Sequence, residues 1–259
     1  MASEEAAVDA LFAELMRAGE SAPRLRDVLA RPDLDEVVLR SVLRLPVPVR
    51  FLELVAVAPP WSERPRLLGG VALNPKTPRV LALRLLPSLF WRDLADVAAS
   101  PRLPRGVRGR AEAILQDQLP DMRMGEKITL AKIATPPVLT RLLAETDPKT
   151  AQACLINPRL REEDLVTAVR QDTVTMGLLE AAAASSRWGQ RYAVRLALVL
   201  QPRTPLGVAL TQLTSLLDRD LERAAGTEGV KPLVRAAALR LVEDRRPEGR
   251  NPMRSGTQS

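Results

Sequence analysis

Apolar residues recur along this chain at helical intervals, and prolines divide the pattern into short segments. In one such segment, apolar residues recur every three or four positions and predict one buried helix face: Val80, Leu83, Leu86 and Phe90. Thr77 is expected to cap this helix through its hydroxyl, and Pro78 suits the first turn, where no amide hydrogen is needed. Pro87 is expected to kink or shorten the helix.

The segment recurs later in the chain. Residues 74–115 align without a gap with residues 201–242. The first part of the match pairs Pro75, Thr77, Pro78, Ala82, Leu83, Leu86, Ser88 and Leu89 with Pro202, Thr204, Pro205, Ala209, Leu210, Leu213, Ser215 and Leu216. Such a match indicates an internal repeat, which determines the architecture more strongly than any single motif.

Shorter copies occupy the intervening chain. Pro32 precedes Pro75 at nearly the same spacing at which Pro158 precedes Pro202, and Thr135 with Pro136 resembles the start described above. Each predicted helix can bury only one stripe, so neighbouring copies must supply the rest of the core. We therefore predict an all-α fold, an elongated α-solenoid (α-α superhelix) with repeats of mixed length from about residue 20 to 245.

The repeat length resembles that of the HEAT/armadillo class of α-solenoids. The stretch Ala134–Leu160, with its Thr-Pro-Pro, Asp-Pro and Asn-Pro pairs, resembles the leucine-rich repeat variant (LRV), a bacterial helical repeat. That resemblance covers about one-fifth of the chain closely. A known protein of that family carries a cysteine-rich iron–sulfur segment, but this chain has one cysteine, so no cluster and no other cofactor is expected.

Composition agrees with a helical protein. Apolar residues make up 46% of the chain and aromatic residues only 3%, so leucine, alanine and valine must fill the core. No apolar run is long enough to suggest a membrane span. The acidic N-terminal stretch predicts an amphipathic helix rather than a secretory signal. Because Cys154 is the single cysteine, we expect no internal disulfide and a cytoplasmic location.

The residue inventory excludes many reactions. The chain has no histidine, which removes Ser/His/Asp and Cys/His catalysis and nearly every zinc site. No phosphate-binding glycine motif follows a predicted strand. Cys154 lies in an apolar helical stretch and is interpreted as a buried small hydrophobe, with a reactive thiol as the lesser alternative. We therefore expect a protein that is not an enzyme and holds no metal.

The formal charge is +7, and only five of the 38 basic residues are lysine. A basic chain suits a nucleic-acid partner. The predominance of arginine is also typical of a GC-rich coding bias, and part of the excess lies near the C-terminus. The charge alone leaves both explanations open.

Two basic clusters are candidate binding surfaces. The first contains Arg102, Arg105, Arg108 and Arg110. The second contains Arg187, Arg191 and Arg195, spaced as on one helix face from Arg187 to Leu200, together with Trp188. Arginine beside aromatic residues can hold phosphates or stacked bases. The clusters can equally bind an acidic peptide, solvate a surface or connect repeats; each tryptophan is interpreted first as a packing residue.

Arg108, Arg191 and Arg235 are predicted to occupy the same place in three repeats, and Asp93 and Asp220 precede Arg108 and Arg235 at one common spacing. In a solenoid, such residues usually bond one repeat to the next. On this interpretation Arg191→Glu should destabilise the fold by about 1–3 kcal/mol. Arg187→Glu should cost almost nothing, because the side chain is expected to be exposed.

The pattern predicts one helical-repeat domain over residues 1–245, with a capping helix over residues 1–20 and repeats over about 21–245. Residues 246–259 are predicted to form a disordered basic tail. The stretch from Asp244 onward has two prolines and two glycines and little apolar surface to offset its ordering entropy, so disorder is expected to begin there.

Two functional hypotheses follow. The first is a non-enzymatic protein-interaction scaffold or adaptor, which binds a protein or peptide on a helical-repeat surface and involves no membrane. The second is a nucleic-acid-binding protein similar in architecture to the DNA-alkylation-repeat glycosylases, whose HEAT-like units hold DNA. No motif of that family is matched here, so this hypothesis is an analogy of fold.

Overall fold

The computed structural model describes residues 2–145 and 147–246, and the regular structure of these residues is entirely helical. The prediction of an all-α fold is therefore confirmed. Contacts divide the chain into unit 1, residues 1–141, and unit 2, residues 142–259. Each unit is described by itself. The predicted disordered tail lies outside the described residues except for its first residue, Arg246.

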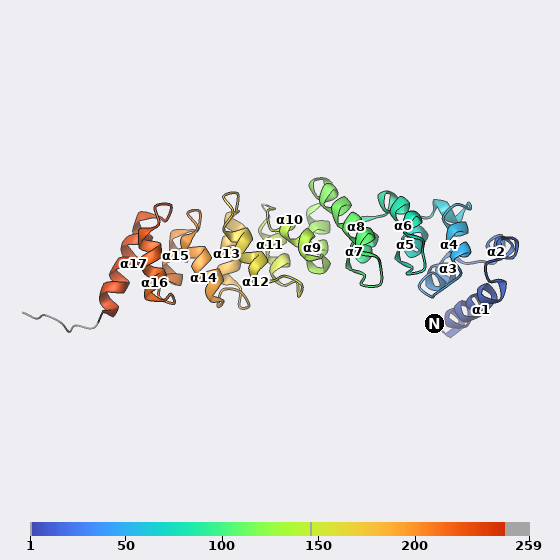
Figure 1. Cartoon of the computed structure of the whole chain (residues 1–259), viewed down its shortest axis with the longest axis horizontal. Helices are drawn as coiled ribbons and strands as arrows, with labels where there is room; N and C mark the ends of the chain where they lie inside the picture. Colours follow the sequence, from blue (N-terminus) through green and yellow to red (C-terminus); the bar gives the residue numbers. More distant parts are fainter. Residues whose placement is uncertain (1, 146, 247–259) are drawn as a thin grey trace, which may run out of the picture. The chain divides into compact units, whose positions relative to one another are not determined.

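The helices of unit 1 are short and are separated by tight turns (Figure 1). They are, in chain order, α1 (Ala2–Ala18), α2 (Ala22–Leu29), α3 (Glu36–Val42), α4 (Val49–Val55), α5 (Pro65–Leu73), α6 (Arg79–Leu85), α7 (Trp91–Ala99), α8 (Arg105–Gln118), α9 (Met124–Ile133) and α10 (Pro136–Leu142). Single 3₁₀ turns lie at η1 (Trp61–Glu63), η2 (Leu86–Ser88) and η3 (Leu119–Asp121).

Unit 2 contains helices of similar length. They are α11 (Pro148–Leu155), α12 (Glu162–Val169), α13 (Met176–Ala184), α14 (Tyr192–Leu200), α15 (Leu206–Leu213), α16 (Asp218–Gly226) and α17 (Pro232–Arg245). Helix α17 continues past Asp244, so disorder does not begin there as expected. The Arg245 guanidinium donates to the carbonyl oxygens of Leu216 and Thr214 at 2.7 and 2.8 Å, which holds the end of this helix.

Helices α2–α8 of unit 1 correspond to helices α11–α17 of unit 2. Helices α5, α7 and α8 have the same lengths as α14, α16 and α17 and precede them by one constant offset, the offset of the sequence match between residues 74–115 and 201–242. Every helix pair that packs closely in unit 2 has its counterpart in unit 1. The described residues therefore contain two copies of a seven-helix arrangement, a longer duplication than the sequence match predicts.

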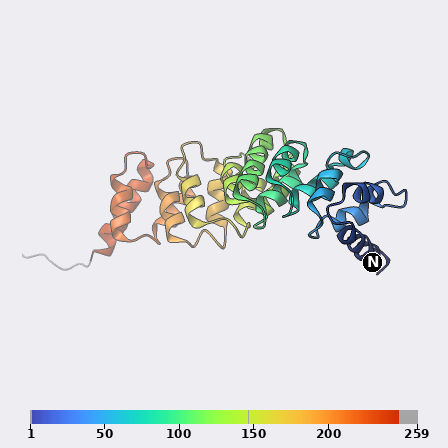
Figure 2. The ribbon, with the colours of Figure 1, turned by 45° about the vertical axis from the view of Figure 1, so that its right-hand side comes forward.

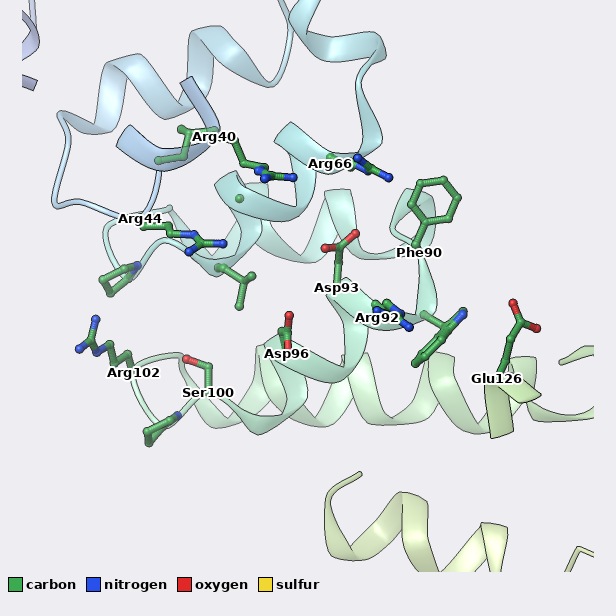
Figure 3. Close-up of a pocket in the computed structure, with 16 residues that line it drawn as sticks. Arg40, Arg44, Arg66, Phe90, Arg92, Asp93, Asp96, Ser100, Arg102 and Glu126 are labelled. Carbon is green, nitrogen blue, oxygen red and sulfur yellow. The ribbon is translucent and has the colours of Figure 1, made fainter. Parts of the chain in front are cut away.

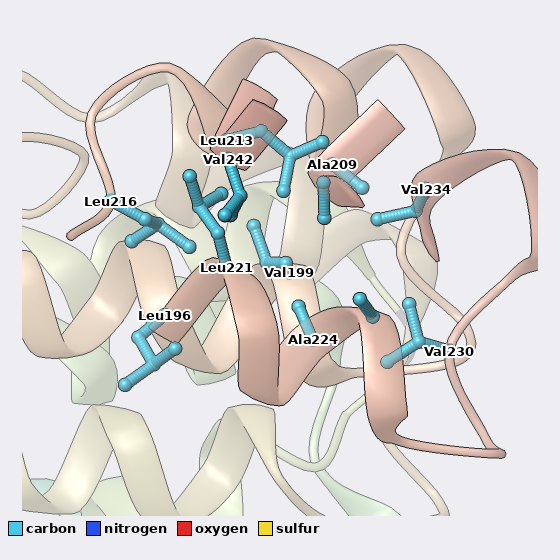
Figure 4. Close-up of a cluster of buried hydrophobic side chains, with 12 residues drawn as sticks. Leu196, Val199, Ala209, Leu213, Leu216, Leu221, Ala224, Val230, Val234 and Val242 are labelled. Atoms are coloured by element: carbon cyan, nitrogen blue, oxygen red, sulfur yellow. The ribbon is translucent and has the colours of Figure 1, made fainter. Parts of the chain in front are cut away.

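Within each unit several helices pack on the next but one. In unit 1, α3 packs on α5 and α5 on α7; in unit 2, α12 packs on α14 and α14 on α16. Figures 1 and 2 both show α16 and α17 lying side by side. Figure 4 shows the resulting core of α14–α17, where Leu213, Leu221 and Val242 meet. Small aliphatic residues fill this core, as the low aromatic content predicts.

Equivalent hydrogen bonds join the repeats in both copies. The indole N–H of Trp61 donates to the Leu29 carbonyl at 2.9 Å, and that of Trp188 donates to the Leu155 carbonyl at 2.8 Å. Both indoles are nearly buried. The prediction that these two tryptophans are packing residues is confirmed, and burial makes each bond costly to remove.

A second pair of bonds closes the turn after each copy's central helix. Asn74 follows α5, and its side-chain amide donates to the carbonyls of Leu43 and Leu45 at 2.7 and 2.8 Å. Gln201 follows α14 and donates in the same way to Val169 and Gln171 at 2.6 and 3.1 Å. An amide at this position satisfies two carbonyls of the preceding repeat.

The predicted start of α6 is wrong by one residue. Pro78, with extended backbone, occupies the N-cap position and Arg79 begins the helix. The Thr77 hydroxyl instead donates to the Val71 carbonyl at 2.5 Å, at the end of the preceding helix. Helix α10 does begin at Pro136, as expected.

The predicted buried face of α6 is confirmed at Leu86, Leu83 is only partly buried, and the prediction is wrong for Val80 and Phe90. Val80 and Phe90 are 79% and 57% exposed. The buried residues are Leu81, Ala82, Leu85, Leu86 and Leu89. The helix ends at Leu85 and continues as a 3₁₀ turn around Pro87, which shortens it as predicted but changes the residue spacing on its buried face.

Candidate functional site

The second predicted basic cluster does not form one helix face. Residues 185–191 form turns, and α14 begins only at Tyr192. The Gly189 amide donates to the Ser185 carbonyl at 2.8 Å, and a side chain at position 189 would collide with the Ala183 carbonyl. This tight turn allows Trp188 to enter the core, which the spacing of the arginines does not reveal.

The arginines of this cluster are engaged within the chain. Arg187 donates to the carbonyls of Asn157 and Leu160 at 3.0 and 3.2 Å, and its guanidinium lies 4.2 Å from the Trp188 ring. Arg195 donates to the Gly189 carbonyl at 2.8 Å. Arg191 lies 4.0 Å from Glu162 and is largely exposed. The expected roles of Arg187 and Arg191 are therefore reversed: Arg187 joins two repeats, and Arg191 makes only a long ion pair.

The proposed equivalence of three arginines holds for two. Arg108 and Arg235 occupy matching positions in α8 and α17, but Arg191 corresponds to Arg64, the residue before α5. Arg64 lies 3.6 Å from Glu36, the same pair that Arg191 makes with Glu162. In these two pairs the acidic partner of the arginine is therefore a glutamate, not the aspartate that the sequence predicted.

Asp220 and Arg235, expected to bond one repeat to the next, each bond to other groups. The Tyr192 hydroxyl donates to the Asp220 carboxylate. The Arg235 guanidinium donates to the Ala225 carbonyl at 2.8 Å. Asp93 lies in the cleft described below.

The first predicted cluster is spread around the start of α8. Arg102, Arg105 and Arg110 are exposed, and Arg108 is half-buried. Arg105, Arg108 and Arg110 are on α8, whereas Arg102 lies in the preceding turn. Arg102 alone of the four lines a charged hollow on unit 1.

That hollow is a charged cleft of about 920 Å³ in unit 1, which we call the α3–α5–α7 cleft. Five arginines and three carboxylates line it: Arg40, Arg44, Arg66, Arg92, Arg102, Asp93, Asp96 and Glu126. Figure 3 shows Asp93 and Asp96 extending from α7 toward Arg40, Arg44 and Arg66. Its volume lies within the range of ligand-binding pockets.

Two glycines of α5 make room for this cleft. A Cβ atom at Gly69 would lie 2.7 Å from the Cγ atom of Asp93, so the Asp93 carboxyl group lies directly against the α5 backbone. A Cβ atom at Gly70 would lie 3.3 Å from the Leu43 side chain. Without a side chain at Gly69, α5 allows α7 to bring the Asp93 carboxyl group against its backbone.

The attraction of the arginines does not fully offset the effect of burial on the two aspartates of the cleft. Burial raises the pKa of Asp93, Asp96 raises it further, and Arg66 and Arg40 oppose the rise. Burial also raises the pKa of Asp96, against the attraction of Arg44 and Arg92. Among the residues that the structure describes, no hydrogen bond or ion pair joins these aspartates to the arginines of the cleft. Unpaired opposite charges therefore line an open space.

Unit 2 carries different residues at several of the equivalent positions. Gly69 and Gly70 of α5 correspond to Leu196 and Ala197 of α14. Further replacements are Arg40 by Val166, Arg66 by Ala193, Asp96 by Arg223 and Phe90 by Leu217, whereas Arg44, Arg92 and Asp93 recur as Arg170, Arg219 and Asp220. Leu196 is 9% exposed and belongs to the core of unit 2. A hollow of only about 420 Å³ lies there, lined by Arg161, Glu162, Glu163, Val166 and Ala193.

Sequence reasoning missed this cleft because it searched for dense local clusters and for matches between copies. The signal lies in the mismatches, since Arg40, Arg66, Gly69 and Asp96 are the residues that the second copy replaces. The described carboxylates do not form a group of three that could hold a metal ion. Cys154 is buried, and burial raises the pKa of its thiol to about 12, which makes it a poor nucleophile.

Comparison with protein-family models, with curated proteins and with solved structures finds no match for this chain. The search for helices able to cross a bilayer finds none that is sufficiently long and apolar in the described part of the chain.

Proposed function

We propose that this chain is a non-enzymatic protein-interaction scaffold, and that the α3–α5–α7 cleft is where it holds a segment of its partner. The finer architecture belongs to the same proposal: an α-solenoid of HEAT/armadillo type with LRV-like repeats, located in the cytoplasm. The packing of α3 on α5 and α5 on α7, matched by α12 on α14 and α14 on α16, supports a repeat architecture. Repeat proteins of this kind characteristically present extended binding surfaces.

One observation carries the proposal. Two copies of one seven-helix arrangement share the indole bonds and the bonds of Asn74 and Gln201, but the charged cleft of the first, about 920 Å³, is a hollow of about 420 Å³ in the second. Residues that a fold requires are expected in both copies, as for Trp61 and Trp188. Arg40, Arg66 and Asp96 have no such counterpart, and the second copy folds with Val166, Ala193 and Arg223 instead. Folding alone gives no reason for the cleft, whereas binding does.

The nucleic-acid hypothesis has less support. Arg187 and Arg195 already donate to backbone carbonyls, and Arg187 also covers Trp188. Asp93 and Asp96 lie among the arginines of the cleft, and these two carboxylates repel a phosphate backbone. Binding of duplex DNA is the competing outcome in the test that follows.

The test is a selection from a random peptide display library on the full chain. A second selection uses the double variant Arg40→Val with Arg66→Ala, which carries the residues that unit 2 tolerates at these positions. We expect peptides that bind the natural chain and lose their affinity for the variant. A chain that selects no cleft-dependent peptide, and instead binds duplex DNA with steep salt dependence, would contradict the proposal.

A matched control separates the cleft from net charge. Arg84 and Arg110 are exposed and lie outside the cleft, and unit 2 has Thr211 and Ala237 at their positions. The double variant Arg84→Thr with Arg110→Ala removes the same two charges. It should keep the selected peptides bound, and both double variants should melt close to the natural chain.

A further inference from the structure

We infer that the α3–α5–α7 cleft takes an acidic peptide segment in which an apolar side chain accompanies the carboxylates. This inference rests on the proposed function and names the chemistry of the partner. The observations behind it are the charge of the cleft, the placement of its arginines and an exposed aromatic edge.

Charge favours an acidic ligand. Five arginines face three carboxylates around the cleft. One of the three, Glu126, already accepts from the Arg123 amide at 2.9 Å, at the start of α9. The cleft thus offers an excess of guanidinium groups, and electrostatic complementarity at an interface brings a negative partner to a positive site.

The donors of these arginines are available. In the described parts of the chain, Arg40, Arg44 and Arg66 make no hydrogen bond or ion pair to any protein group, unlike the arginines of the 187–195 cluster. Arg40 is on α3, Arg44 lies in the turn that follows this helix, and Arg66 is on α5, where Figure 3 shows it beside Phe90. Guanidinium groups bind carboxylates in a planar, bidentate manner.

Asp93 and Asp96 act on the arginines through space. Arg66 and Arg40 attract Asp93, and Arg44 and Arg92 attract Asp96, without closing ion pairs. This attraction favours guanidinium positions near the aspartates before a ligand arrives. The same carboxylates disfavour ligands of high charge density such as phosphates, so they select for single carboxylates.

The aromatic edge accounts for the apolar part of the ligand. Phe90 is 57% exposed and precedes α7, and Trp91 next to it is half-buried. The Arg92 guanidinium lies 5.1 Å from the Trp91 ring centre, which presents a charged donor beside an aromatic surface. Aromatic residues and arginine are the groups that most often dominate the energy of a protein interface.

The experiment measures fluorescence anisotropy of labelled probes with the full chain. The probes are a peptide that alternates glutamate with phenylalanine, the same peptide with glutamine in place of glutamate, the same peptide with lysine, and a single-stranded DNA oligomer. We expect the glutamate peptide to bind most tightly. Its affinity should fall at least about tenfold with Arg40→Val and Arg66→Ala, because charge-assisted bonds are lost. The Arg84→Thr and Arg110→Ala control should bind it normally.

The outcomes separate this inference from the proposed function. Tighter binding of the lysine peptide, lost on Asp93→Asn with Asp96→Asn, would overturn the acidic class but leave a peptide scaffold. Equal binding of the glutamate and glutamine peptides, or no binding of either, would also overturn it, while the library selection still tests the scaffold. Preferential binding of the DNA oligomer at the cleft arginines would overturn both.

Discussion

The carboxyl group of Asp93 lies against the backbone of Gly69, so close that a methyl group there would approach its Cγ atom to 2.7 Å. Gly109, on α8, has no neighbour within 4 Å of such a methyl group. Gly109→Ala should therefore stabilise the fold by about 0.5–1 kcal/mol, the usual gain of alanine over glycine in a helix. Gly69→Ala should gain less or destabilise, because Asp93 must move. Chemical denaturation of both variants checks this, and equal gains would contradict the close packing of α5 and α7.

Replacing Arg187 should destabilise the fold more than replacing Arg191, which is the reverse of the order that the sequence predicts. Arg187→Ala removes donors to two backbone carbonyls and should destabilise by about 1 kcal/mol or more. Arg191→Ala removes one long, exposed ion pair and should cost about 0–1 kcal/mol. Thermal melts of the two variants decide the order. A larger loss for Arg191→Ala would restore the sequence interpretation.

The duplicated indole bonds predict matched effects. Trp61→Phe and Trp188→Phe each leave a buried carbonyl, that of Leu29 or Leu155, without its donor. Each change should therefore destabilise its unit by about 1–3 kcal/mol. Hydrogen exchange, measured separately for peptides of each unit, follows the loss. A large effect at one tryptophan and none at the other would show that the two bonds are not equivalent.

The raised pKa of Asp93 predicts a pH-dependent contribution to stability. Because the folded protein holds this proton more tightly, the contribution of Asp93 is most favourable below its ordinary value near 3.8 and is lost as pH rises through its folded pKa. Arg40, Arg44, Arg66 and Arg92 remain charged throughout, and the pKa of Asp96 shifts in the same direction.

The matching variant is Asp93→Asn, which keeps the shape and removes the titration. Its stability relative to the natural chain should increase as pH rises through this window and become constant near neutral pH. Denaturation midpoints measured from acid to neutral pH check the sign. A variant whose relative stability falls with rising pH would show that the arginines outweigh burial.

The helical content and the repeat register could be predicted because they depend on local signals. Prolines at positions such as 75 and 202 mark turns, and apolar periodicity marks helices. Exact faces were less predictable: α6 ends early in the 3₁₀ turn around Pro87, and Val80 and Phe90 of the predicted buried stripe are exposed.

The binding cleft could not be predicted in the same way. Arg40, Arg66 and Asp96 lie on three helices, so only tertiary packing brings them together. The prediction of one helix face for the 187–195 cluster was wrong because its i, i+4, i+8 spacing matches a helix, whereas Gly189 and buried Trp188 require a turn. Tertiary contacts overrode the local pattern there, and arginines chosen for their spacing proved to be engaged with the backbone.

The most direct test of the account uses two equivalent, exposed positions. Phe90 precedes α7 and is 57% exposed, and Leu217 precedes α16 and is 53% exposed. A photoreactive phenylalanine analogue at each position in turn is irradiated with a peptide selected on the natural chain. We predict efficient crosslinking from position 90, suppressed by Arg40→Val with Arg66→Ala, and little from position 217. Equal crosslinking from both positions, or crosslinking from position 217 only, would contradict the claim that the α3–α5–α7 cleft is the binding site.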